Sequence, residues 1–193
     1  EVLISCMRMH QKYLSCIDKN GALANCFIVV ANIDSDDSGQ KIIEGNERVL
    51  RARLTDAKFF WELDLKTSLH SKVKLLSGRI FHQKLGTMAE KVDRLKVLSE
   101  QLAISIPQIK KNMVLKAASL AKADLSTGMV NEFPNLQGII GRYYALKDNE
   151  DSDIADAIAE HYAPQGPQDL CPSKPISICI SMADKIDLLT SLW

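Results

Sequence analysis

The sequence predicts an α+β protein that is mostly helical, with a short antiparallel β segment at the N-terminus, one long helix and then an all-helical bundle. Three observations lead to this fold class. Residues 1–33 contain alternating and β-branched runs around the turn residues Asn20-Gly21, which is typical of a hairpin or small meander. Residues 41–66 repeat apolar side chains at helical spacing. The chain after Thr67 does so in several shorter segments.

Composition and charge exclude several classes of protein. The chain has 193 residues, of which 46% are hydrophobic and 25% charged, as in ordinary globular proteins. Lys and Arg together equal Asp and Glu at 24 each, so any nucleic-acid surface would have to be a local patch. No apolar run reaches the roughly 20 residues of a membrane span, and no leader peptide is visible. The odd number of five cysteines without a CxxC motif indicates free thiols in a reducing cytoplasm.

Residues 1–66 are expected to form a first domain of a β-hairpin or meander followed by a long connecting helix. We expect strands in the segments CMRMHQKYLSCI and CFIVVANI, with CFIVV buried on both faces. The helical stretch carries Arg48, Arg51 and Lys58 opposite its apolar stripe. Two interpretations are open: a solvated face held by i, i+4 ion pairs to Glu44, Glu47 and Glu62, or a basic ridge that contacts phosphate.

Residues 67–193 are expected to form a second, entirely helical domain. Thr87 and Glu90 have the spacing of a capping box at the start of one helix. The next helix is expected to begin at Pro107 and to carry Asp124 on its inward apolar stripe. Gly138 and Gly141 would let a neighbouring segment approach closely. The last helix, residues 176–193, is apolar on nearly all sides, which favours an enclosed position.

Four side chains of this second domain are candidate metal ligands. His82, Asp124, His161 and Asp184 follow one another on consecutive predicted helices, an order that resembles the HD-domain family of metal-dependent phosphohydrolases. That resemblance implies an HD-like bundle in which a His, a His-Asp doublet and a distal Asp hold a divalent metal. Here the doublet is Ala123-Asp124, so the central imidazole is missing. We therefore expect neither hydrolysis nor a divalent metal at this site, and regard any metal site as vestigial.

A structural interpretation of the same residues needs no metal. A buried carboxylate is costly unless it is paired or hydrogen-bonded. Asp124 and Asp184 could instead be interior carboxylates held by Lys122, Lys185, His82 or backbone N–H groups.

A second resemblance covers essentially the whole chain. The segments that carry it, in this order and spacing, are MRMHQKYLSC, FIVVANI, GNERVLRARLTDAKFFWELDLK, FHQKLGTMAEKVDRL, LAKADLSTGMVNEFPNLQGIIGRYYA and MADKIDLL. In combination they resemble the β subunit of bacterial heterotetrameric glycyl-tRNA synthetase. We accordingly expect the chain to be an internal piece of a longer subunit with a catalytically retired HD-like module.

This resemblance implies a function and partners. The family's α2β2 enzyme ligates glycine to tRNA(Gly) with ATP and Mg²⁺; its α subunit activates glycine, and its β subunit contributes mainly to tRNA binding. We expect this segment to be non-catalytic, to bind tRNA and to act as a scaffold in the cytoplasm, without DNA or membrane partners. The candidate tRNA-facing residues are Arg8, His10, Lys12, Arg48, Arg51 and Lys58.

Two alternatives stay open beside it. One is an HD-type phosphohydrolase with a reduced metal site, and the other is a structural spacer that contacts only protein. The sequence has no phosphate-cradling glycine run, so we expect no ATP and no other cofactor on this piece. It also has no RNP-type aromatic pair and no KH-type GXXG loop, so we expect phosphate contacts rather than base reading.

Overall fold

A computed structural model describes residues 2–107 and 109–192, apart from the side chains of residues 9–11. The chain divides into two compact units, Glu1–Leu63 and Asp64–Trp193. Helices dominate both units, and two small antiparallel sheets accompany them, which confirms the predicted mostly helical α+β class. None of the helices in the described residues is long and apolar enough to cross a membrane.

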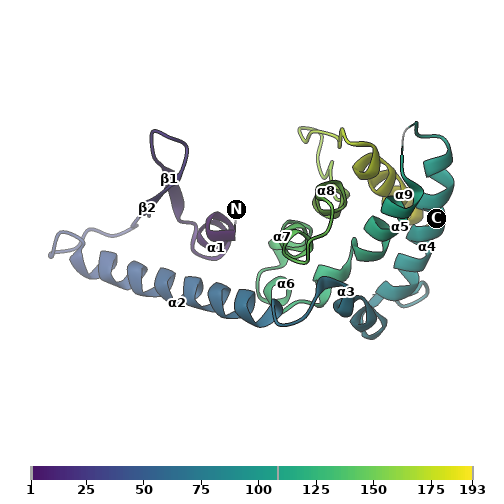
Figure 1. Cartoon of the computed structure of the whole chain (residues 1–193). Coiled ribbons are helices and arrows are strands. Elements are labelled where there is room, and N and C mark those ends of the chain that lie inside the picture. Colours follow the sequence, from purple (N-terminus) through teal and green to yellow (C-terminus); the bar gives the residue numbers. More distant parts are fainter. Residues whose placement is uncertain (1, 108, 193) are drawn as a thin grey trace. The chain divides into compact units, whose positions relative to one another are not determined.

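Unit 1 consists of two helices and one hairpin (Figure 1). Its elements are α1 (Val2–Gln11), β1 (Leu14–Ile17), β2 (Leu23–Ile28) and α2 (Gln40–Asp64), whose last residue already belongs to unit 2.

The predicted strand at the start of the chain is wrong, because Val2–Gln11 forms helix α1. The alternation of apolar and polar residues around Met7 suggested a strand. Leu3, Cys6 and Met7, however, have the i, i+3, i+4 spacing of one helical face, and Cys6 and Met7 are buried in the structure. Burial of that face decides the local structure, and the β segment begins only after Lys12, whose φ of 53° follows the helix end.

Strands β1 and β2 pair antiparallel, with Leu14 opposite Ile28 and the register shifting after Ser15. The predicted turn is confirmed, since Gly21 has a φ of +80° and the Asp18 carboxylate accepts hydrogen bonds from the following backbone N–H groups. The expectation that CFIVV is buried on both faces is wrong. Cys26, Ile28 and Val30 are exposed, because the sheet has only two strands.

Tyr13 connects the hairpin of unit 1 to its long helix. The Tyr13 side chain is buried, its ring packs 4.8 Å from the Phe27 ring, and its hydroxyl donates a 2.8 Å hydrogen bond to Asn46 Oδ1 on α2. A buried phenol needs a polar partner, and Asn46 supplies it.

Unit 2 is a helical body. Its elements are α3 (Leu69–Lys72), η1 (Val73–Gly78), β3 (Ile80–His82), β4 (Gly86–Thr87), α4 (Met88–Ile104), α5 (Lys111–Leu120), η2 (Ala123–Ser126), α6 (Gly128–Glu132), η3 (Pro134–Leu136), α7 (Ile139–Lys147), α8 (Ser152–Glu160) and α9 (Pro175–Leu192). Helix α4 packs on α5 and α9, and α8 packs on α5, α7 and α9 (Figure 1). The HD-like assignment of this bundle is not confirmed.

Two details of unit 2 differ from the all-helical expectation. The predicted stripe through Ile80 does not continue as a helix, because Ile80–His82 pairs with Gly86–Thr87 in a small antiparallel sheet. Helix α5 ends at Leu120, so Asp124 lies in the separate 3-10 turn η2. Asp124 nevertheless points inward as predicted, and its exposed fraction is 0%.

One capping signal read from the sequence is confirmed, but the helix start expected at Pro107 is wrong, because Pro107 lies in a turn and α5 begins only at Lys111. Thr87 and Glu90 form a reciprocal capping box at the start of α4, and the Asp151 side chain caps α8. Helix α9 is less enclosed than expected, since Met182, Leu188 and Leu189 are exposed. Its buried face nonetheless includes Cys179, Ile180 and Asp187.

Candidate functional site

A buried network of lysines and aspartates lies between α4, η2 and α9. We call it the lysine–aspartate cluster, and its members are Lys91, Arg94, Lys122, Asp184 and Asp187. Lys91 Nζ lies 3.0 Å from Asp184 Oδ1 and 2.8 Å from Asp187 Oδ2. Arg94 Nε lies 2.6 Å from Asp187 Oδ1. Three cations thus face two carboxylates in a region largely closed to water.

Lys122 is the innermost cation of this cluster. Its Nζ lies 3.1 Å from Asp184 Oδ2 and 4.0 Å from the centre of the Tyr162 ring. Burial lowers the pKa of Lys122 to about 8, and the neighbouring Asp184 carboxylate opposes this shift. The pKa of Asp184 is lowered to about 2: burial raises it, but the charges of Lys122 and Lys91 outweigh burial.

A backbone amide binds the buried Asp124 carboxylate. The Gly138 N–H donates a hydrogen bond to Asp124 Oδ2, whereas Oδ1 has no hydrogen-bond partner among the described residues. Burial raises the pKa of Asp124 to about 6, against the opposing effects of the Gly138 amide and the Lys122 charge. The predicted close approach at the glycines is confirmed, since a Cβ on Gly141 would lie 3.0 Å from Asp124 Oδ2.

His161 ends helix α8 and is completely buried. Its Nδ1 lies 2.8 Å from the carbonyl oxygen of Ile158, and its Nε2 has no partner within the described part of the chain. Burial, followed by the nearby positive charge of Lys122, lowers the pKa of His161 to about 3. The imidazole is therefore neutral at physiological pH.

The structure brings three of the four metal candidates close to one cation. The charge of Lys122 shifts the pKa of Asp124, His161 and Asp184 alike. His82 is not among them, since it lies exposed on β3 with its Nδ1 accepting a hydrogen bond from the Lys84 N–H. Among the described residues, no group of three or more His, Cys, Asp or Glu side chains could hold a metal ion.

This geometry does not support the phosphohydrolase alternative. The Lys122 ammonium lies against Asp184, where a divalent ion would need negative and neutral ligands, and the Gly138 amide binds one oxygen of the Asp124 carboxylate. The interpretation of interior carboxylates held by Lys122 and backbone N–H groups fits these contacts. Lys185 does not contribute to it, because its Nζ binds the carbonyl oxygen of Ala163 and the hydroxyl of Ser181.

Sequence reasoning missed a second buried carboxylate, Asp64. Its oxygens accept hydrogen bonds from the backbone N–H groups of Gly128 and Met129 at 3.0 and 2.9 Å and from the Tyr144 hydroxyl at 3.0 Å. Lys72 Nζ lies 3.3 Å away. These partners are 8 to 80 residues from Asp64 in sequence, so no short-range spacing in the sequence predicts the contacts.

Sequence reasoning also missed Asp187, although a signal was present. Asp184 and Asp187 are spaced i, i+3 on α9, and Lys91 and Arg94 are spaced i, i+3 on α4. Residues three apart share one side of a helix, so two matching pairs of opposite charge on mostly apolar helices predict a buried ionic contact.

The candidate nucleic-acid-binding residues all belong to unit 1. Arg8 lies exposed on α1 and Lys12 just after it, not on a strand as expected. The side chain of His10 lies outside the described part of the structure. The remaining three candidates, Arg48, Arg51 and Lys58, are exposed on α2.

The expected ion pairs of α2 form only in part. Lys58 Nζ lies 3.8 Å from Glu62 Oε1, and both side chains are more than half exposed. In the described part of the chain, no ion pair forms between Arg48 and Glu44 or between Arg51 and Glu47. Arg48 and Arg51 are therefore not neutralised by the carboxylates that their spacing suggested.

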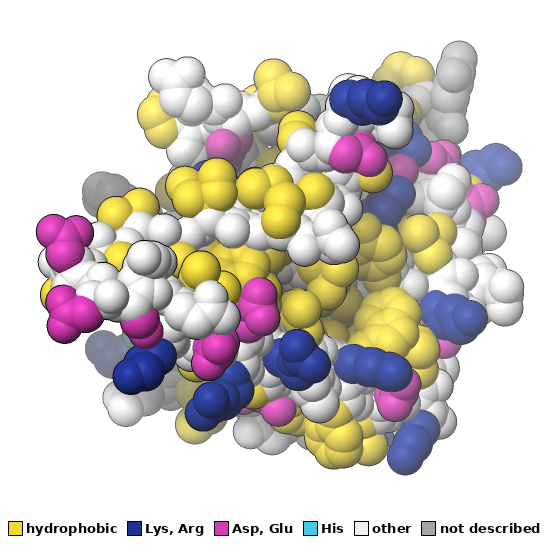
Figure 2. Space-filling view, turned by 90° about the vertical axis from the view of Figure 1, so that its left-hand side faces the viewer, with side chains coloured by type: hydrophobic (Ala, Val, Ile, Leu, Met, Phe, Trp, Pro, Cys, Tyr) yellow, Lys and Arg dark blue, Asp and Glu magenta, His cyan; other side chains and the backbone are white. Residues whose placement is uncertain are grey.

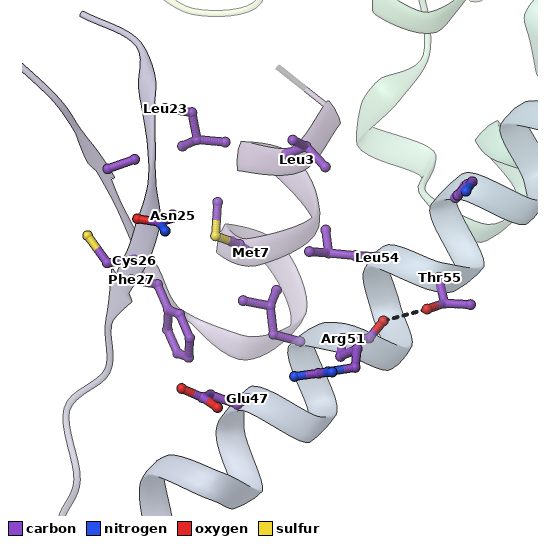
Figure 3. A pocket seen from close by; sticks show the side chains of 13 residues that line it. Leu3, Met7, Leu23, Asn25, Cys26, Phe27, Glu47, Arg51, Leu54 and Thr55 are labelled. Carbon is purple, nitrogen blue, oxygen red and sulfur yellow. Dashed lines mark hydrogen bonds between the residues drawn. The ribbon is translucent and has the colours of Figure 1, made fainter.

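An open groove of about 720 Å³ lies within unit 1, between α1, β2 and α2. Figure 3 shows Leu3 and Met7 on one side of it and Leu54 with Arg51 on another. Lys58 and Glu47 also line the groove, so an apolar floor has charged groups at its margin.

Apolar side chains are also exposed elsewhere on unit 1. Figure 2 shows, on one face, hydrophobic side chains gathered next to Lys and Arg side chains. The exposed large apolar residues of unit 1 include Leu14, Ile17, Ile28, Val30, Ile33, Ile43 and Phe59. Where such residues form one contiguous patch, they mark a surface that contacts another protein or a ligand.

Comparison with known proteins assigns the chain to a class and then to a family. The family model described as glycyl-tRNA synthetase beta subunit matches residues 1–193, which places the chain among aminoacyl-tRNA synthetase subunits. The chain belongs to the glycyl-tRNA synthetase β subunit family.

Individual relatives agree with this assignment. The chain is similar to the glycine–tRNA ligase beta subunits of Rhodospirillum centenum, at 46% identity over 100% of the chain, and of Trichlorobacter lovleyi, at 48% identity over 98%. That of Neisseria meningitidis serogroup A is 44% identical over 100% of the chain. The chain spans 27 to 28% of the length of these relatives.

Proposed function

We propose that this chain is a non-catalytic, tRNA-binding and scaffolding segment of the β subunit of an enzyme that ligates glycine to tRNA(Gly) with ATP. The single observation that carries the proposal is the family match over all 193 residues. The partners are tRNA(Gly) and the glycyl-tRNA synthetase α subunit, and the enzyme works in the cytoplasm. ATP and Mg²⁺ belong to the whole enzyme, and this segment binds neither.

The tRNA-facing surface is assigned to unit 1, with Arg48 and Arg51 at its centre. Both are exposed on the same long helix, and neither forms an ion pair in the described structure. The planar guanidinium group of arginine donates several hydrogen bonds to phosphate. An arginine that forms no ion pair can bind phosphate without first releasing a carboxylate. Lys58, at the margin of the groove, extends this surface along α2, while Arg8 and Lys12 are further candidates on and just after α1.

Unit 2 is assigned the scaffolding role. Most of its buried charges make internal contacts, because Lys91, Lys122 and Arg94 neutralise Asp184 and Asp187, and Asp64 binds backbone amides. Groups engaged in this way hold elements together and are not positioned for reaction with a substrate.

A binding measurement with two double variants tests the proposal. Arg48→Glu with Arg51→Glu reverses the unpaired charges, and Lys74→Glu with Lys84→Glu makes the same change in net charge at exposed positions of unit 2. We expect the first pair to weaken tRNA(Gly) binding by about tenfold or more and to reduce the salt slope by about 1.5–2, because two phosphate contacts are lost.

The control pair should leave tRNA affinity within about twofold of the unaltered chain, since only remote screening changes. Equal weakening by both pairs would refute a specific surface on α2. Binding to the α subunit without any tRNA affinity would instead select a purely structural spacer.

A further inference from the structure

Cys16 and Cys26 lie next to each other on the two strands of the unit 1 hairpin. Leu14 pairs with Ile28 and Ser15 with Phe27, and Cys16 and Cys26 directly adjoin this last in-register pair, at the point where the ladder shifts register. Alternate residues of a strand point to opposite faces, and both cysteines therefore share the face opposite Phe27. The Cys26 thiol is near enough to raise the pKa of Cys16.

The pair is accessible, unlike two of the other three cysteines. Cys26 is exposed and Cys16 half-buried, whereas Cys6 and Cys179 are buried in their units. Cys171 is exposed but lies in unit 2. Desolvation, followed by the contact with Cys26, raises the pKa of Cys16, so less of this thiol is thiolate at neutral pH and its attack becomes faster as the pH rises.

Ser15 and Phe27 face each other in the antiparallel ladder, where paired Cα atoms lie about 4.5–5.5 Å apart. Cys16 and Cys26 adjoin this pair, which places them near the Cα separation that a disulfide bridges.

We propose that Cys16 and Cys26 form a dithiol modification site that is oxidised to a cross-strand disulfide by a low-molecular-weight disulfide such as oxidised glutathione. The exposed Cys26 thiolate attacks one glutathione sulfur, a Cys26–glutathione bond forms, and one glutathione thiolate leaves. The Cys16 thiolate then attacks Cys26 Sγ and expels the second glutathione. The oxidant accepts two electrons, and the two cysteine protons pass to the two glutathione thiolates.

The crosslink would act on the groove of unit 1. Five consecutive residues of β2, Leu23 to Phe27, line that groove. A bond between Cys16 and Cys26 fixes β2 to β1 and so restricts one wall of the groove (Figure 3). The site depends on the hairpin geometry alone and not on the proposed binding of tRNA.

Oxidation followed by intact-mass and peptide analysis tests the proposal. The reduced chain is incubated at pH 8 with reduced and oxidised glutathione in varied ratio, then alkylated. We expect the Cys16–Cys26 disulfide, seen as a mass loss of about 2 Da and as a linked peptide pair, to form at the lowest proportion of oxidised glutathione. Cys171, without a neighbouring thiol, should instead carry a glutathione adduct at higher proportions.

Single variants separate a dithiol from two independent thiols. In Cys16→Ser the Cys26 thiol should keep its glutathione adduct, and Cys171→Ser should leave the crosslink unchanged. The proposal is overturned when Cys26 accumulates a stable glutathione adduct in the unaltered chain, or when Cys16 and Cys26 stay reduced while Cys171 reacts.

Discussion

Replacing His161 should reverse the sign of the chain's response to mild acid. Burial and the Lys122 charge lower the His161 pKa to about 3, whereas the unfolded chain has the ordinary value of 6.5. Between these values the unfolded state binds a proton that the folded state does not. The contribution of neutral His161 to stability is therefore fully present above pH 6.5 and is lost as the pH falls toward 3.

Asp124 works in the opposite direction over part of the same range. Its pKa is about 6 in the folded state, chiefly because it is buried, and has the ordinary value of 3.8 in the unfolded chain. Its contribution is fully present below pH 3.8 and is lost as the pH rises through 6. Acidification from pH 7 to pH 5 thus removes about 2 kcal/mol through His161 and restores about 1 kcal/mol through Asp124.

Urea unfolding at pH 7 and pH 5 measures the difference. The unaltered chain should lose about 0.5–1 kcal/mol of unfolding free energy on acidification, as the sum of the two effects. The variant His161→Leu replaces the imidazole with an apolar side chain of similar size that does not titrate. Its free energy of unfolding should instead be about 1 kcal/mol higher at pH 5 than at pH 7. Adding Asp124→Asn should remove that gain.

Each variant is compared with itself at the two pH values. A pH-independent loss of stability from the missing Nδ1 contact with Ile158 therefore cancels. A His161→Leu chain that loses as much stability between pH 7 and pH 5 as the unaltered one would refute the reasoning. Such a result would mean that His161 is protonated in the folded state.

Three further predictions concern the interior of unit 2. Asp64→Ala should lower the unfolding free energy by about 3–5 kcal/mol in urea titrations, because a buried lysine and two amides lose their acceptor; a loss below about 1 kcal/mol would contradict this. Gly141→Ala should cost about 1–3 kcal/mol, since its Cβ would lie 2.7 Å from Ile158 Cγ2, while Gly78→Ala, with open space around it, is the control and should be near neutral. Adding Mn²⁺ or Zn²⁺ should leave the melting temperature of the chain unchanged, and a concentration-dependent rise would revive a metal site near Lys122.

The sequence predicted the local features of the fold better than its interior contacts. The Thr87–Glu90 capping box, the Asn20-Gly21 turn and the inward direction of Asp124 depend on spacings of a few residues, and all three are confirmed. The strand expected around Met7 failed because a short apolar–polar alternation also fits a helix, and only packing within unit 1 decides between them.

The candidate site was predicted only in part, because spacing indicates which side chains point inward but not which residues they contact. Asp124, His161 and Asp184 were identified as inward polar groups, and the missing imidazole at Ala123 argued against a hydrolase, an alternative that the family match does not support. The partners of these groups could not be predicted from spacing. Asp184 binds Lys122, which is 62 residues away in sequence, and Asp187 binds Lys91, which is 96 residues away. Only the tertiary arrangement brings such charges together.

The most direct test of the account is a kinetic comparison in the assembled enzyme, because the central claim is that this segment binds tRNA and takes no part in the chemistry. In a complex of α and β subunits with Arg48→Glu and Arg51→Glu, we expect KM for tRNA(Gly) to rise about tenfold, with kcat for glycylation and glycine activation by ATP unchanged. A fall in kcat or in glycine activation at an unchanged KM would contradict the account.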